Sequence, residues 1–343
     1  MTRIENWTRP NIRSLTPYSS AKDEFTGSDA LFLDANENPY GTYNRYPDPQ
    51  QRKLKTVLVI QSNISTDNVF IGNGSDEVID LLLRIFCEPG RDKIATFSPT
   101  YGMYDVSASI HNVEMVKIPL DENFDIVNTD ISPILNDEQI KVLFLCSPNN
   151  PTGNNLNLAK MLELIEGFDG IVCVDEAYID FSEQRSLSDW ISQFDNLVVA
   201  RTMSKARGLA GARVGYAFAN SIIIELLNKV KPPYNVSALN QQEAIRALED
   251  EATFLRQKES ILLERDKLLN ALTEIPAITR IFPTASNFVL IQLNRANEIY
   301  DALLQQKIIV RNRSKQIPNT LRITIGTQEE NQKLLTALKQ LLT

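Results

Sequence analysis

Between residues 69 and 200 the chain repeats a short apolar run, a turn and, in several places, a helical segment. The apolar runs are continuous, whereas a strand with one face in water alternates apolar and polar residues. Continuous runs therefore indicate strands that are buried on both faces. The pattern predicts an α/β fold in which a mainly parallel sheet is covered by helices. The expected strands are 69–71, 93–97, 114–118, 142–146, 171–174 and 197–200.

Beyond residue 233 the pattern changes. Residues 238–272 are rich in Glu, Lys, Leu, Gln and Arg and contain neither Pro nor Gly, which predicts a long helix. This helix would lead to a smaller α+β unit with strands at 287–292, 308–311 and 321–325 and a closing helix at 328–342. Because 343 residues suit a large and a smaller domain, we expect a large domain at 38–245. The small domain would comprise 246–343 and an N-terminal arm, 1–37. Residues 31–39 would form a short strand that runs into a Pro-terminated turn.

Composition excludes several classes of function. The chain has 35 basic and 43 acidic residues, a net charge of −8, and no Lys/Arg block, so nucleic acid is not an expected partner. It lacks both an apolar run of about 18 residues and a signal peptide, which predicts a cytoplasmic protein without a membrane partner. Cys87, Cys146 and Cys173 lie in separate apolar runs, which favours buried free thiols. With His111 as the only histidine, we expect neither a His-dependent triad nor a metal site.

The segment that follows the strand at 197–200 suggests a specific chemistry. Ser204 and Lys205 follow this strand, and Arg213 lies eight residues after the lysine. Open α/β sheets bind ligands at the carboxyl ends of their strands. A partly desolvated amine there can form a Schiff base with an aldehyde, while Ser204 and Arg213 suit a phosphate. Taken alone, however, a lysine after a strand is usually a solvated surface residue.

Two further strand ends carry polar residues. Asp175 ends the apolar run at 171–174, and a buried acid needs a cation. A protonated pyridine nitrogen would be such a cation, and Asn150 and Tyr178 could hydrogen-bond a phenolic oxygen on the same ring. The loop at 147–153, which contains Asn150, is by itself also consistent with an ordinary turn.

A third candidate lies between the strand at 69–71 and the helix after it. Gly74 and Ser75 would place free backbone N–H groups and a hydroxyl at a helix N-terminus, which favours anion binding. The segment lacks the P-loop and dinucleotide motifs, and alone it also fits an ordinary capped helix. Together, these strand ends offer the partners that pyridoxal 5′-phosphate requires.

The order and spacing of the motifs resemble the pyridoxal-phosphate aminotransferases of fold type I, and within them the group that acts on L-histidinol phosphate. The resemblance implies a seven-stranded sheet in the large domain and covers nearly the whole chain. The similar segments are 15–18, 33–37, 45–47, 74–77, 99–104, 147–153, 175–178, 204–205 with Arg213, and 321–326.

The resemblance also implies roles for single residues. Lys205 would carry the imine with the cofactor and move a proton, with Asp175 and Tyr178 as the other catalytic residues. Cofactor binding would involve Asp76, within the motif at 74–77, and Tyr101, which would stack on the ring. Tyr46 would reach the cofactor phosphate of a neighbouring subunit, so the active unit would be a homodimer with shared active sites. One departure is Arg207, where the family usually has an aromatic or apolar residue.

The expected substrate residues come from the small domain and the N-terminal arm. Arg311 and Arg322 lie on neighbouring predicted strands, and planar guanidiniums bind carboxylates and phosphates. By resemblance, both would hold the substrate phosphate in one half-reaction and the carboxylates of glutamate in the other, assisted by Tyr18 and Asn36. A surface ion pair is the alternative for either arginine.

The resulting hypothesis is a ping-pong aminotransferase of histidine biosynthesis. It would convert L-histidinol phosphate and 2-oxoglutarate to 3-(imidazol-4-yl)-2-oxopropyl phosphate and L-glutamate. An aromatic amino acid aminotransferase or a threonine-phosphate decarboxylase would use the same cofactor. A regulatory protein that only binds pyridoxal phosphate is a further alternative, but such proteins normally carry a DNA-binding module, of which charge and length give no sign.

Overall fold

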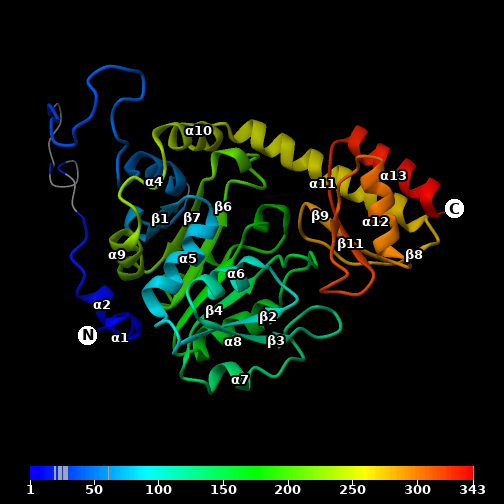
Figure 1. Ribbon diagram of the computed structural model, residues 1–343, viewed down its shortest axis with the longest axis horizontal. Coiled ribbons are helices and arrows are strands. Elements are labelled where there is room, and N and C mark those ends of the chain that lie inside the picture. The colour runs from blue at the N-terminus through cyan, green and yellow to red at the C-terminus, as the bar shows by residue number, and fades with distance from the viewer. Residues whose placement is uncertain (19–20, 22–24, 26–29, 61, 343) are drawn as a thin grey trace.

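The computed structural model describes residues 1–18, 21, 25, 30–60 and 62–342. It contains a large mixed sheet in the middle of the molecule and a small antiparallel sheet to its right in Figure 1. The helices of the described residues are α1 Arg3–Trp7, α2 Pro10–Arg13, α4 Arg52–Val59, α5 Ser75–Phe86, α6 Met103–Ile110, α7 Ser132–Leu135, α8 Leu158–Gly167, α9 Ser221–Val230, α10 Ala238–Glu249, α11 Glu251–Thr273, α12 Ala296–Gln305 and α13 Gln328–Leu342.

The large sheet has seven strands in the order β1-β7-β6-β5-β4-β2-β3. Strands β6, β5, β4, β2 and β3 run parallel, whereas β7 is antiparallel to both β6 and β1. The expected mainly parallel, seven-stranded sheet is therefore confirmed. The strands are β1 Val69–Gly72, β2 Lys93–Ser98, β3 Glu114–Pro119, β4 Ile140–Cys146, β5 Ile171–Asp175, β6 Leu197–Thr202 and β7 Gly215–Ala219.

Both faces of this sheet are buried, which explains the continuous apolar runs. On β4, Leu143 and Leu145 pack into one hydrophobic core, whereas Val142 and Phe144 pack into another. Helices α5, α6 and α9 contribute to the core of Phe144, and α4, α8 and α10 to the core of Leu143. Because successive side chains of a strand point to opposite faces, most residues of a central strand are apolar.

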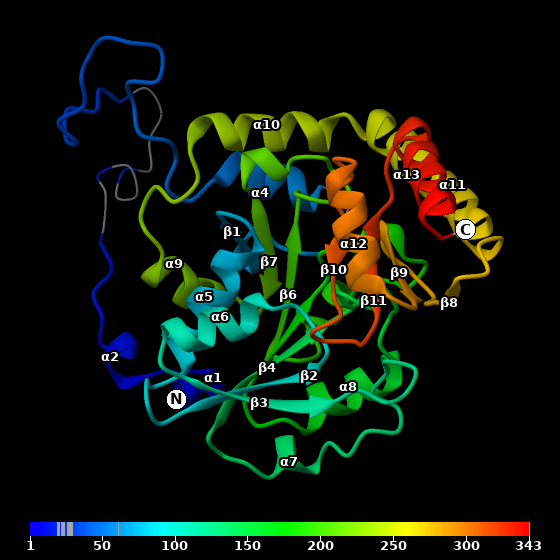
Figure 2. The same cartoon turned by 45° about the vertical axis from the view of Figure 1, so that its right-hand side comes forward.

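The small sheet has the order β10-β11-β9-β8, and every pairing in it is antiparallel. Its own core is formed with α11, α12 and α13, which cover one face of the sheet (Figure 2). This C-terminal unit matches the expected α+β architecture. The strands are β8 Ile278–Ile281, β9 Phe288–Leu293, β10 Arg311–Asn312 and β11 Thr320–Thr324.

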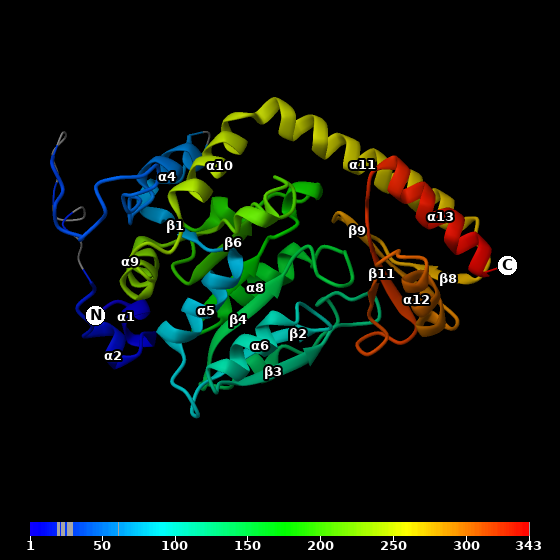
Figure 3. The same ribbon diagram turned by 45° about the horizontal axis from the view of Figure 1, so that its top comes forward.

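The long helix expected at 238–272 is two helices, so that detail of the prediction is wrong. Asp250, with φ −90° and ψ 62°, ends α10, and its side chain accepts a hydrogen bond from the Thr253 N–H at 3.1 Å as the N-cap of α11. Aspartate caps helices well, so the break needs neither Pro nor Gly. Helix α10 covers the large sheet, and α11 continues to the small one (Figure 3).

The N-terminal segment differs from expectation in two ways. Residues 31–39 form no strand, and Leu31 and Leu33 are about 80% exposed. Helix α1 packs on the large unit through Ile4, and Arg9 pairs with Glu88 at 2.9 Å. This packing differs from the expected grouping of 1–37 with the small domain. Residues 19–20, 22–24 and 26–29 of that group lie outside the described residues, and the domain boundaries stay predictions.

Two simpler features complete the fold. Cys87, Cys146 and Cys173 are buried free thiols, as predicted. The Nε2 atom of His111 lies 2.6 Å from an oxygen of Asp80 on α5, so this histidine has a local structural contact. None of the helices in the described ranges has both the length and the apolar character needed to span a membrane.

Candidate functional site

A cavity of about 330 Å³ lies where the carboxyl ends of the central parallel strands of the large sheet meet β10 and β11 of the small one. Eleven of the residues proposed from the sequence line it. They are Ser75, Asp76, Tyr101, Asn150, Asp175, Tyr178, Ser204, Lys205, Arg213, Arg311 and Arg322. Residues more than 240 positions apart in the sequence therefore form one site.

Lys205 lies in the loop after β6 and faces this cavity. Its Nζ atom is 5.6 Å from the centre of the Tyr178 ring. The pKa of Lys205 is lowered, first because surrounding protein atoms partly desolvate the amine and second because Arg322 is near. Both effects favour the neutral amine, the form that can act as a nucleophile or accept a proton.

Asp175 is the last residue of β5 and is only 3% exposed. Its carboxylate accepts hydrogen bonds from the Tyr104 hydroxyl at 2.9 Å and from the Ala177 N–H at 3.1 Å. Burial raises the pKa of Asp175 to about 6, because these neutral donors offset only part of the lost hydration. The carboxylate would thus be stabilised by a cation in the cavity. Sequence reasoning gave Tyr104 no role, although it lies within the motif at 99–104.

An anion could bind between the start of α5 and Arg213. Gly74, the N-cap of α5, offers no side-chain cap, so the first N–H groups of the helix remain available at Ser75 and Asp76. Arg213 donates to Ser204 Oγ at 3.4 Å and to Asp76 at 3.3 Å. Gly74 has φ +82°, a backbone conformation that favours glycine, and a Cβ there would lie 2.7 Å from the Arg213 guanidinium, which would have to move. Because its carboxylate would repel an anion, Asp76 can contribute only its N–H.

A second group of hydrogen bonds crosses from the large unit to the small one. Asn150 donates to the Tyr178 hydroxyl at 3.5 Å, and Arg322 donates to the side-chain oxygen of Asn150. Burial raises the pKa of Tyr178, so its hydroxyl keeps its proton as a donor. The Tyr101 hydroxyl donates to Asp76 at 3.1 Å, and the ring also lines the cavity. Asn150 and Tyr178 are thus adjacent, as a shared ligand oxygen would require.

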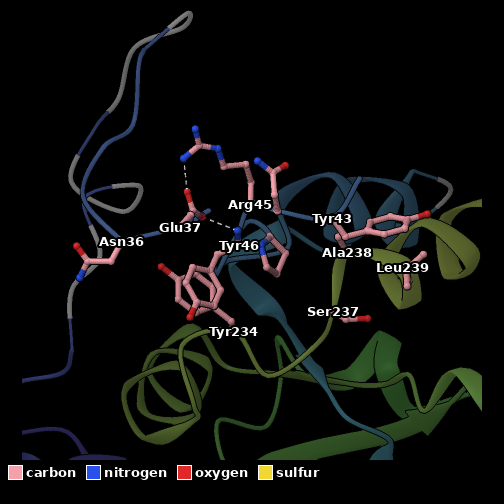
Figure 4. A pocket seen from close by; sticks show the side chains of 12 residues that line it. Asn36, Glu37, Tyr43, Arg45, Tyr46, Tyr234, Ser237, Ala238 and Leu239 are labelled. Atoms are coloured by element: carbon pink, nitrogen blue, oxygen red, sulfur yellow. Dashed lines mark hydrogen bonds and ion pairs between the residues drawn. The ribbon is translucent and has the colours of Figure 1, made fainter. Parts of the chain in front are cut away.

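Three residues that the sequence placed at the site are elsewhere in this chain. Tyr18 is 71% exposed, and Asn36 and Tyr46 line a separate cavity of about 430 Å³ (Figure 4). There the Tyr46 ring stacks on Tyr234, with centroids 4.3 Å apart. Within one chain, the structure does not bring these residues to Lys205.

The cavity also contains residues that sequence reasoning missed. Thr202 is the last residue of β6 and lines the cavity. Its hydroxyl donates to Ser204 Oγ at 3.0 Å. Arg313 lines the cavity beside the two expected arginines. Its position two residues after Arg311 was an available signal, because side chains at i and i+2 of a strand share a face.

Comparisons with known proteins agree with this geometry. A model of the family "Aminotransferase class I and II" matches residues 28–338. The histidinol-phosphate aminotransferase of Parabacteroides distasonis is 49% identical over 99% of this chain and 99% of its own. The crystal structure of the histidinol-phosphate aminotransferase from Clostridium acetobutylicum has a TM-score of 0.78 and 27% identity, over 87% of this chain and 91% of its own.

A third comparison concerns the fold. The histidinol-phosphate aminotransferase from Sinorhizobium meliloti, solved in complex with pyridoxal-5′-phosphate, has a TM-score of 0.79 at 21% identity, over 97% of this chain and 96% of its own. The expected fold is therefore confirmed. The chain belongs to the class I and II aminotransferase family and, within it, to the group of the histidinol-phosphate aminotransferases.

Proposed function

We propose that this protein transfers an amino group between L-histidinol phosphate and 2-oxoglutarate. The observation that carries the proposal is one cavity that combines Lys205, the buried carboxylate of Asp175, an anion-binding helix start and the arginines of the small sheet. The relative that is 49% identical bears the name of this activity. An aromatic amino acid as the main donor would leave the arginines with less negative charge to bind.

The family confirms the expected cofactor, pyridoxal 5′-phosphate, and the residues present fit it. Its phosphate suits the N–H groups of Ser75 and Asp76 and the side chains of Ser204 and Arg213. Asp175 would hold a protonated ring nitrogen, since among the described residues its buried carboxylate is hydrogen-bonded only by neutral donors. Asn150 and Tyr178 would donate to the ring oxygen. When bound, the cofactor supplies an aldehyde for the substrate amine and a ring that withdraws electrons from the substrate Cα.

The chain's own residues then bind the substrate and move protons. The lowered pKa of Lys205 suits its Nζ to take the proton from the substrate Cα and to return it elsewhere. Tyr178 and Asn150 keep the reacting groups oriented. Arg311 and Arg322 bind the phosphate of one substrate and, after the first product leaves, the carboxylates of the other. One cavity would thus serve both half-reactions of a ping-pong reaction.

Half-reactions of the purified holoenzyme would test this proposal. Histidinol phosphate should convert the cofactor to its amino form, as measured by the change in visible absorbance, and 2-oxoglutarate should reverse the change. Phenylalanine should react much more slowly, and threonine phosphate should release no CO₂. A preference for phenylalanine, or CO₂ release, would support the rival enzymes instead. A spectrum that no amino donor changes would favour a regulatory protein.

We further propose a cytoplasmic homodimer in which Tyr46, Asn36 and Tyr18 complete the partner's cavity. Tyr46 is 49% exposed, and its neighbours Tyr40 and Tyr43 are still more exposed, so this segment is available to a second chain. Mixing inactive Lys205→Ala and Tyr46→Ala chains would test sharing. A mixed dimer has one intact site only if Tyr46 serves the partner, so activity should return on mixing. If the mixture stayed inactive, Tyr46 would contribute to the cavity of its own chain and not to that of the partner.

A further inference from the structure

Three guanidiniums occupy one face of the small sheet. Arg311 is paired in register with Arg322 across β10 and β11, and residues directly opposite each other in an antiparallel pair have side chains on the same face. Arg313 follows two residues after Arg311, and its N–H continues the pairing by donating to the Thr320 carbonyl at 3.0 Å. All three side chains therefore reach the cavity of Lys205.

None of the three forms an ion pair with an acidic side chain of the described residues. Within the described ranges, the side chains of Arg311 and Arg313 have neither a hydrogen bond nor an ion pair, and Nε of Arg313 is buried without a partner. Other half-buried arginines do have acidic partners, as Arg201 has Asp180 at 2.6 Å. A buried unpaired donor and adjacent like charges both destabilise a fold. An anionic ligand would relieve both costs at once.

The number of donors indicates which anion needs Arg313. A carboxylate has one charge and two oxygens, which one guanidinium can bind bidentately. A phosphate monoester has up to two charges and three terminal oxygens, so it needs further donors. One nitrogen of Arg322 already donates to Asn150, whereas no side chain in the described part of the chain competes for the donors of Arg313. The additional donor that a phosphate requires is therefore available at Arg313.

We propose that Arg313 is a specificity residue that selects the phosphate-bearing amino donor over a carboxylate-bearing one. The proposal rests on the function proposed above, since it assigns a substrate group within the same cavity. It gives Arg313 a different task from Arg311 and Arg322, which would bind anionic groups in both half-reactions.

The test compares the two half-reactions in holoenzyme variants. Arg313→Gln should raise KM for histidinol phosphate about 10- to 100-fold, the loss expected for a hydrogen bond to a charged group. KM for glutamate should change less than about threefold, and the cofactor spectrum should stay unchanged. Arg313→Lys keeps the charge and should be intermediate. Lys315→Gln removes an exposed charge nearby, outside the cavity, and serves as the matched control.

Dead-end ligands separate this inference from the choice of substrate. In the glutamate half-reaction, Arg313→Gln should weaken inhibition by methyl phosphate about 10-fold or more, but leave inhibition by glutarate nearly unchanged. This result would support the role of Arg313 even if histidinol phosphate proved a poor donor for the wild type. Equal effects on both inhibitors, or none on either, would overturn the inference.

Discussion

The two walls of the cavity differ in whether their charged side chains have hydrogen-bond partners within the protein. On the large-sheet wall, Asp175 is hydrogen-bonded to Tyr104, and Arg213 is bonded to Asp76 and Ser204. On the small-sheet wall, Arg311 and Arg313 have no partner within the described part of the chain. A resident cofactor needs partners held in place before catalysis, whereas a substrate brings its own negative charge at each turnover. The large-sheet wall is therefore preorganised for the cofactor, whereas Arg311 and Arg313 of the small-sheet wall gain their partners only when a substrate binds.

The sharpest test of the large-sheet wall is Lys205→Ala. It should lower kcat by about 10⁴-fold or more, because it removes both the nucleophilic amine and the proton carrier. The cofactor should still bind noncovalently, which absorbance of the dialysed protein would reveal. Lys53→Ala, at an exposed lysine of α4, is the control and should behave as wild type. Retained transamination would refute the role of Lys205.

Asp175→Asn keeps the size of the side chain and removes its charge. We expect kcat to fall about 10²- to 10⁴-fold, since breaking a buried ion pair costs about 3–5 kcal/mol. Tyr104→Phe removes one hydrogen bond to Asp175 but leaves the carboxylate charge. Its kcat should therefore fall only about tenfold. Steady-state kinetics of both variants would rank the two effects. If Asp175→Asn were nearly as active as wild type, the carboxylate would have no role in activating the ring.

The same carboxylate predicts a pH dependence of stability without cofactor. Burial raises the pKa of Asp175 from 3.8 to about 6, so the protonated form stabilises the fold. This contribution is complete below 3.8 and is lost as the pH rises through 6. Asp175→Asn should therefore gain stability over wild type with rising pH, by up to about 3 kcal/mol near neutrality. Urea denaturation of both apoproteins at about pH 4.5 and about pH 7.5 would measure this, and an advantage that does not vary with pH would contradict it.

The smallest expected effect is on stability, and it concerns Arg207, which lies where α10 of the large unit meets α11 of the small one. Arg207, near Lys205, donates to the Ala247 carbonyl of α10 at 3.1 Å, pairs with Glu251 of α11 at 3.0 Å, and lies 3.6 Å from the Phe254 ring centre. It thus joins the lysine loop to both sides of the helix break.

Arg207→Met should lower the free energy of unfolding by about 1–2 kcal/mol, because it removes the ion pair and the cation–π contact but keeps an apolar stem. Arg207→Lys should be intermediate. KM for both substrates should stay near wild type, since Arg207 lies outside the cavity. Unchanged denaturation midpoints would mean that these contacts do not stabilise the junction.

Much of the fold was predictable because buried strands leave continuous apolar runs. Six strands of the large sheet were located in this way, whereas β7 was not, since Gly215-Tyr-Ala-Phe-Ala219 is short and lacks β-branched residues. The break between α10 and α11 was also missed, because an aspartate in a polar helix gives no strong signal. Local propensity cannot decide whether such a residue continues a helix or caps one.

The site was predictable where polar residues lie at a strand end, as Asp175 does, or in the loop just after one, as Asn150 and Lys205 do. Arg313 was not predicted because it lies just beyond the two-residue strand β10, although its spacing of two residues from Arg311 is consistent with the same face. Tyr104 was not recognised as a partner of Asp175, because their contact spans 71 positions of sequence. Tyr46 and Asn36 lie outside the cavity in a single chain.

By itself, the sequence determined the kinds of element and the chemistry at their ends. Apolar periodicity and the residue that follows each strand are local properties. Only the tertiary structure decided which of these ends share a cavity, which charges have partners there, and which arginines remain unpaired. Whether a side chain is buried, and whether it has a hydrogen-bond or ion-pair partner, depends on distances between segments far apart in the chain. No local sequence pattern specifies such distances.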